Sequence, residues 1–147
     1  MSKSTFVYVT YIRSTPEKVF KALTDREITR QYWAHENVSD WKPGSPWEHR
    51  EHSTGRAKVV GEVIEAKGPN RLVISWASPE NKEARSRVTF DIETAADMVK
   101  LTVTHDELEA GSEMDRAIRA GWPRVAASLK TYIETGKALD TWAGMEH

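Results

Sequence analysis

The sequence predicts an α+β fold in which one antiparallel sheet packs against a long C-terminal helix. Between residues 47 and 106 the hydrophobic pattern has a period of two and is interrupted by short turn signals. From residue 112 to residue 136 apolar residues recur in steps of three and four, which places them on one stripe of a helix. The sheet and the helix each have one apolar face, and packing these faces together removes both from water.

The first predicted strand covers residues 6–12, which are all β-branched or aromatic. A helix follows it, because Thr15 is a favourable N-cap and Pro16 suits the first helical position. Thr24 or Asp25 then caps a second short helix.

Residues 34–46 form a predicted loop with a Pro-Gly turn. Five strands follow it, and the turns between them are short enough to require antiparallel neighbours. Together with the first strand they make a sheet of about six strands. The five strands cover residues 47–52, 56–66, 71–77, 85–93 and 98–106.

The last helix is predicted to begin after the N-cap Ser112 and to stop at Gly136. Gly121 and Pro123 flank Trp122 near its middle, and these are the two least favourable residue types inside a helix. Pro123 removes one hydrogen bond and clashes with the preceding turn. We therefore expect a kink or break here, with Trp122 turned into the core and Gly121 allowing a close approach to a strand.

Length and composition limit the classes of function. The 147 residues predict a single domain over residues 1–147, with its core at about 6–136 and a C-terminal tail at 137–147. The absence of cysteine excludes disulfides and thiolate metal sites. With 21 basic and 22 acidic residues, no nucleic-acid partner is expected. The start does not resemble a signal peptide and no apolar run approaches the roughly 20 residues of a membrane span, so we expect a cytoplasmic protein without membrane insertion.

Four segments resemble a known family. They are TPEKVFKALTD (residues 15–25), GEVIEAKGPNRLVISW (61–76), LTVTHDEL (101–108) and GWPRVAASLKTYIETG (121–136). In order and spacing they are similar to the family related to the C-terminal domain of the heat-shock protein 90 ATPase activator, within the START/Bet v-like (SRPBCC) superfamily. The resemblance implies a helix-grip fold, with a curved sheet around the long C-terminal helix and a cavity between them. It does not imply one activity, because superfamily members bind lipids, hormones and polyketides or catalyse cyclisations and ring hydroxylations.

Six tryptophans are the most unusual feature of the composition. If the sheet curls around the helix, several aromatic side chains converge, and such a lining suits a planar or lipid-like apolar ligand. The alternative is that the rings fill the space themselves, because protein cores pack densely. The predicted ligand-binding residues are Trp33, Trp41, Trp47, His49, Trp76, Phe90, His105 and Trp122.

His105 and His49 are weak candidates for catalysis. His105 faces inward by alternation and is either an acid/base group or a core histidine that ties the strand to the helix. His49 shares a face with Glu51, and Glu65 is a second carboxylate for a dyad, although carboxylates near strand ends are usually solvated. No metal site is expected, since His52 points to the face opposite His49. The sequence has no Gly-rich phosphate loop, and we expect no cofactor.

The sequence is compatible with three functions. The first is binding of a small hydrophobic or aromatic molecule in an internal cavity, in stress response or transport. The second is a co-chaperone-type protein interaction domain, as the family resemblance suggests. The third is a cyclase or hydrolase that uses pocket histidines, although no motif supports enzyme activity. A small apolar ligand is the expected partner, and the chain after Gly136 either frames a homodimer interface or packs back on the domain.

Overall fold

A single antiparallel sheet of seven strands forms the framework of the described chain, which covers residues 2–33 and 35–139 of this computed structural model. The strand order is β1-β7-β6-β5-β4-β3-β2, so the first strand in the sequence pairs with the last. The strands are β1 (Lys3–Ile12), β2 (Glu36–Val38), β3 (Pro46–Arg50), β4 (Ala57–Lys67), β5 (Arg71–Ser78), β6 (Asn81–Ala95) and β7 (Met98–Glu109).

The short strand β2 lies inside the segment that the sequence predicts as a loop. It has no apolar alternation, because its first two residues, Glu36 and Asn37, are polar and buried. Side-chain hydrogen bonds hold it instead. The Asn37 backbone N–H donates to Thr29 Oγ1 at 2.9 Å, and Asn37 Nδ2 donates to the carbonyl oxygen of Leu23 at 3.1 Å. The sheet therefore has one strand more than the hydrophobic pattern indicates.

Three helices complete the fold, and their caps agree with the sequence. They are α1 (Pro16–Thr24), α2 (Arg26–Trp33) and α3 (Glu113–Thr135). The Thr15 side chain caps α1, and Ser112 caps α3 by accepting from the Asp115 backbone N–H. Of the two candidates for α2, Asp25 is the cap, since its Oδ1 accepts from the backbone N–H groups of the following turn.

The helix α3 is continuous through Gly121, Trp122 and Pro123, so of the two expected outcomes, a kink or a break, the break is wrong. A stripe of buried residues continues past the proline through Val125 and Leu129, and such tertiary packing supplies most of the stability of a protein helix. Trp122 does turn into the core, where it is 3% exposed. The expected close approach at Gly121 is also wrong, because a Cβ atom there would meet nothing within 4 Å.

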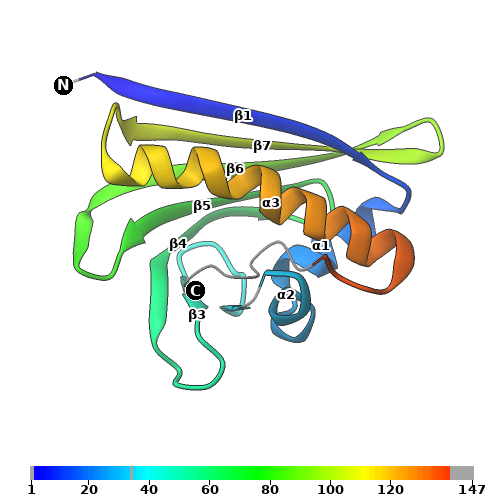
Figure 1. Ribbon diagram of the computed structural model, residues 1–147, viewed down its shortest axis with the longest axis horizontal. Helices are drawn as coiled ribbons and strands as arrows, with labels where there is room; N and C mark the ends of the chain where they lie inside the picture. Colours follow the sequence, from blue (N-terminus) through cyan, green and yellow to red (C-terminus); the bar gives the residue numbers. More distant parts are fainter. Residues whose placement is uncertain (1, 34, 140–147) are drawn as a thin grey trace.

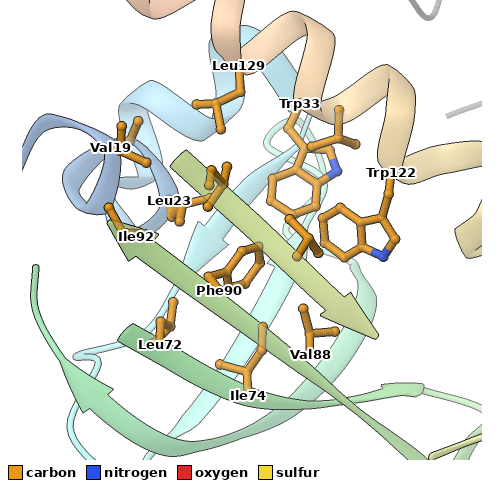
Figure 2. Packing of buried hydrophobic residues seen from close by; sticks show 14 of the residues in the cluster. Val19, Leu23, Trp33, Leu72, Ile74, Val88, Phe90, Ile92, Trp122 and Leu129 are labelled. Atoms are coloured by element: carbon orange, nitrogen blue, oxygen red, sulfur yellow. The ribbon is translucent and has the colours of Figure 1, made fainter. Parts of the chain in front are cut away.

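The core lies between α3 and the concave face of the sheet. Figure 1 shows α3 crossing the curved sheet, with α1 and α2 beside its C-terminal half. Figure 2 shows Trp33 and Trp122 side by side beneath α3, with Phe90 and Val88 rising toward them from the sheet. This is the helix-grip arrangement expected from the sequence, and one end of the grip is closed by the two short helices.

The start of the C-terminal tail packs back on the domain. Ala138 contacts the core, and the Leu139 carbonyl oxygen accepts from Ser128 Oγ at 3.2 Å. Residues 140–147 of the predicted tail lie outside the described residues. Within the described ranges, none of the helices is both long and apolar enough to span a membrane.

Candidate functional site

The eight predicted ligand-binding residues come together in one aromatic cluster. Trp76 is its centre, with ring centroids 5.6 Å from Trp47 and 5.4 Å from Trp122. Trp33 lies 5.6 Å from Trp122 on the other side. Further contacts join Trp41 to Trp47 at 6.4 Å, His49 to Trp33 at 4.8 Å, Phe90 to Trp122 at 5.8 Å and His105 to Trp76 at 5.4 Å.

A hydrogen-bond chain runs through the buried side of this cluster and ends on β5. Trp122 Nε1 donates to His105 Nδ1 at 3.0 Å. The other ring nitrogen of His105, Nε2, lies 2.7 Å from Ser86 Oγ. Ser86 Oγ in turn donates to the carbonyl oxygen of Trp76 at 3.2 Å. The chain thus joins α3, β7, β6 and β5 through side chains that are all buried.

This chain assigns one tautomer to His105. An indole N–H can only donate, so Nδ1 must be the unprotonated nitrogen, and Nε2 carries the proton that goes to Ser86. Burial lowers the pKa of His105 to about 4, against the smaller opposing effects of Asp106 and Asp115. The imidazole is therefore neutral at pH 7 with both nitrogens engaged. This geometry fits a core histidine that ties sheet to helix better than an acid/base group.

His49 is also buried and does not form the dyad considered from the sequence. Its Nδ1 lies 2.7 Å from Asn37 Oδ1, and burial lowers its pKa to about 3, with the neighbouring ring of His35 adding to the effect. Glu51 instead accepts from Thr54 and pairs with Lys58. The second carboxylate, Glu65, pairs with Arg71 and Lys67 on the sheet surface. Both carboxylates are half-buried near the ends of strands, where they remain in contact with solvent instead of pointing into the core.

Gly61 sets the position of Trp47, which the sequence alone does not indicate. Trp47 Nε1 donates to the carbonyl oxygen of Ser75 at 2.7 Å, and this bond passes directly over Gly61. A Cβ atom at residue 61 would collide with both the Ser75 oxygen and the Trp47 indole nitrogen. The absence of a side chain on β4 therefore allows the indole to cross from β3 to β5.

Trp76 is the one member of the cluster whose indole nitrogen is buried without a hydrogen-bond partner anywhere in the described chain. The residue is 7% exposed and is enclosed by Trp47, Trp122 and His105. Buried indole N–H groups usually have an acceptor, because losing the hydrogen bond to water costs free energy. An unpaired donor is therefore present at the centre of the aromatic cluster.

A pocket that includes Ser86 lies beside the aromatic cluster, and none of the eight cluster members lines it. It has a volume of about 590 Å³ and opens between the first turns of α3 and the β5–β6 hairpin. We call it the open-end pocket, because it lies at the end of the grip away from α1 and α2. It is lined by Ser2, Lys3, Lys58, Ser78, Asn81, Glu83, Ala84, Arg85, Ser86, Glu107, Leu108, Glu109, Ser112, Glu113, Met114 and Ala117.

Ser86 belongs both to this pocket and to the hydrogen-bond chain. Ser86 is not among the residues predicted from the sequence, although the sequence contains a signal for it. Ser86 shares its face of β6 with Val88 and Phe90, so alternation places a hydroxyl group on the buried face. The apolar lining residues Met114 and Ala117 have no comparable signal, because they belong to the same stripe as the core residues of α3.

A separate polar cluster joins α2 and β2 to the turn that follows β3. The buried carboxylate of Glu36 accepts from Arg26 at 3.0 and 3.1 Å and lies 3.2 Å from His52 Nδ1. The hydrogen bond from Arg26 lowers the pKa of Glu36 to about 2 despite its burial. No group of three or more His, Asp or Glu side chains in the described ranges is arranged to hold a metal ion.

Comparison with known proteins places the chain in a family. Residues 13–134 match the family described as Activator of Hsp90 ATPase homolog 1-like protein. The chain belongs to this family. The family resemblance stated from the four sequence segments is thereby confirmed. No functionally curated protein sequence matches the chain.

Solved structures from several organisms have a similar fold. The Aha1 dimer from Colwellia psychrerythraea matches with a TM-score of 0.77 at 20% identity, over 92% of this chain and 99% of that one. A protein from Cytophaga hutchinsonii matches with a TM-score of 0.72 at 26% identity, over 92% and 98%. An Hsp90 activator from Plasmodium falciparum matches with a TM-score of 0.71 at 21% identity, over 90% and 96%. These similarities establish the shared fold.

Proposed function

We propose that the protein binds a small amphipathic molecule in the open-end pocket. The observation that carries the proposal is the pocket itself, with a volume of about 590 Å³. Small-molecule sites usually have volumes of about 300–1,000 Å³ and combine apolar walls with a few polar groups. Leu108, Met114 and Ala117 supply apolar surface here, and Ser86 supplies a buried hydroxyl group.

In this proposal the eight aromatic-cluster residues support the ligand rather than surround it. Their rings already contact one another at centroid distances of 4.8–6.4 Å, which is the range of directly packed aromatic pairs. The cluster holds β5 and β6 at a fixed distance from α3. It thereby keeps Ser86 at the base of the pocket, where an incoming molecule would meet it.

A pair of matched variants tests the proposal. Ala117 lines the pocket and Ala120 lies on an exposed part of the same helix outside it. We expect native mass spectrometry of the purified protein to detect a retained small molecule in the wild type and in A120W. A117W fills the pocket and should lose that molecule while keeping the same circular dichroism spectrum. Equal retention in A117W and A120W would exclude the pocket as the binding site.

A second candidate function is a co-chaperone-type interaction with an Hsp90-class ATPase. Family membership favours it, and the similar Plasmodium falciparum structure is that of an Hsp90 activator. On β1 the side chains of Val7, Val9 and Tyr11 are 54%, 42% and 45% exposed, which is unusual for large apolar groups and leaves surface for a protein partner. Stimulation of Hsp90 ATPase activity by the wild type and loss of it in V7T/V9T would support this function. If a saturating concentration of the protein does not stimulate Hsp90 ATPase activity, this function is excluded.

A further inference from the structure

The strand β1 forms one edge of the sheet and carries a row of exposed apolar side chains. It pairs with β7 on one side only, and Figure 1 shows it along the outer margin of the sheet. Val7, Val9 and Tyr11 are three of the five large apolar side chains that are exposed in the described chain. They alternate with more buried residues, so all three lie on the outer face of the same edge strand.

The backbone of Val7, Val9 and Tyr11 points away from β7. The carbonyl oxygen of Tyr11 accepts from Lys130 Nζ on α3 at 2.6 Å, so it faces the open side of the strand. Successive residues of an antiparallel strand direct their N–H and C=O groups to opposite sides. Val7 and Val9 have the parity of Tyr11 and therefore present their backbone groups to the open side as well. The Tyr11 oxygen has two lone pairs and can accept from a second donor.

Side chains of α3 occupy the edge on both sides of this segment. The Arg13 N–H donates to Glu134 Oε2 at 2.8 Å, and the carbonyl oxygen of Thr5 accepts from Arg119 Nη2 at 3.2 Å. Edge strands are commonly protected from pairing by charged residues or proline, but residues 4–12 contain neither. The edge is therefore open to another strand over residues 7–11, which we call the β1 edge segment.

A second copy of the chain fits the β1 edge segment in one register. When two β1 strands pair antiparallel about a two-fold axis at Val9, Val9 lies opposite Val9 of the other copy, and Val7 lies opposite Tyr11 of the other copy. Each such pair can form two hydrogen bonds, so all the open backbone groups of the segment are used. A β-branched residue opposite an aromatic one is also a favourable cross-strand pair.

A displaced register is less favourable. An axis at Tyr8 would place Arg13 opposite Lys3 of the other copy, so that like charges meet. It would also place Tyr11 opposite Thr5, whose carbonyl oxygen already accepts from α3. With the axis at Val9, Arg13 lies opposite Thr5 and no two like charges face each other along the paired strands.

We propose that the protein forms a homodimer by antiparallel pairing of the β1 edge segments, with the two-fold axis at Val9. The sheet then continues from one copy into the other, and the exposed rows of both copies form one apolar surface. This contact covers the surface considered above for an Hsp90-class partner, so the two interactions compete for residues 7–11. The paired segment is short, so we expect a weak dimer with a dissociation constant on the order of 100 µM.

Sedimentation of the full-length protein at concentrations from about 10 µM to about 1 mM measures the association. In V9K two like charges meet at the two-fold axis, so this variant should stay monomeric throughout. The matched control is I64K, because Ile64 on β4 is another large apolar residue with 47% exposure, but β4 is paired on both sides. I64K should dimerise like the wild type.

Amide hydrogen exchange of the wild type locates the contact without relying on a variant. The Val9 N–H faces solvent in the monomer and is hydrogen-bonded in the dimer, so its exchange should slow about fourfold between the lowest and the highest concentration. The Tyr8 N–H faces β7 in both states, and its exchange should not depend on concentration.

Three outcomes overturn the proposal. The first is a protein that stays monomeric at the highest concentration, which would leave the β1 edge segment to a different partner. The second is a dimer whose formation does not change the exchange of the Val9 N–H or that persists in V9K, since it would use another surface. The third is equal loss of the dimer in V9K and I64K, because association would then depend on overall surface charge rather than on β1.

Discussion

Trp122 on α3 donates its indole N–H to Nδ1 of His105 on β7, with 3.0 Å between the two nitrogen atoms. Both residues are almost fully buried, with exposures of 3% and 0%. The bond therefore connects the helix to the sheet in a region without competing solvent, where breaking it leaves a buried acceptor unpaired. The bond holds α3 against the sheet and fixes the tautomer of His105. That tautomer in turn places the Nε2 proton on Ser86.

Replacing Trp122 with Phe should lower the free energy of unfolding by about 2–4 kcal/mol. The change leaves His105 Nδ1 without a donor and creates a void among Trp33, Trp76 and Phe90. Urea denaturation at pH 7 measures the loss. The matched control is W41F, which replaces the half-buried indole that stacks on Trp47 by a smaller ring and should cost less than half as much. Similar losses in the two variants would contradict the role assigned to the buried hydrogen bond.

The stability of the protein should decrease as the pH falls below about 6.5. Burial lowers the pKa of His105 to about 4 and that of His49 to about 3, while both are near 6.5 in the unfolded chain. Above pH 6.5 both states are neutral and the full stability is present. Below pH 6.5 the two histidines bind protons in the unfolded chain but stay neutral in the folded chain. The free energy of unfolding therefore falls by up to about 1.4 kcal/mol per pH unit for each histidine.

Urea denaturation between pH 5 and pH 7 measures this slope. The variant H105Q keeps a side chain that can donate and accept, and it should lose about half of the slope. S86A removes the partner of Nε2 but keeps the histidine, so its stability should fall at every pH while the slope stays. An unchanged slope in H105Q would show that His105 does not resist protonation in the folded state.

Most of the fold could be predicted from the sequence, because its signals are local. Alternation correctly indicated β6 and β7, and the caps Thr15 and Ser112 indicated the starts of α1 and α3. The strand β2 could not be predicted, since Glu36 and Asn37 are held by side-chain hydrogen bonds to distant residues rather than by an apolar pattern. The continuity of α3 through Pro123 was also missed, because tertiary packing outweighs local propensity there.

The candidate site was predicted only in part, for a related reason. Alternation along β7 correctly indicated that His105 is buried. Parity cannot show which buried groups bond to each other, so the pairing of His49 with Asn37 and of His105 with Trp122 required the structure. The open-end pocket depends on how far α3 and the β5–β6 hairpin extend past the core. Residue types do not encode that distance.

Replacing Gly121 with Ala should raise the free energy of unfolding by about 0.5–1 kcal/mol. Gly121 lies inside α3, and a methyl group there would meet no atom within 4 Å, so the change adds helix propensity without a clash. The control is G136A at the C-cap, where φ is +83° and an alanine is strained, so that variant should be destabilised. Thermal unfolding of both variants gives the signs. A destabilised G121A would mean that Gly121 has a role in packing that the structure does not show.

Replacing Gly61 with Ala should be among the most damaging single changes in the sheet, with a loss of more than about 2 kcal/mol. The new methyl group would occupy the path of the hydrogen bond between Trp47 Nε1 and the Ser75 carbonyl oxygen. Either the indole rotates and its donor is left unpaired, or β4 moves away from its neighbours. The NMR signal of the Trp47 indole N–H reports whether the hydrogen bond is lost, because it should shift upfield when the bond breaks.

The control is G55A in the β3–β4 turn, where φ is +74° and a Cβ atom would meet nothing within 4 Å. G55A should be destabilised only by backbone strain, and its Trp47 signal should not change. A shifted Trp47 signal in G55A would show that the resonance reports a general loss of stability rather than the contact at Gly61.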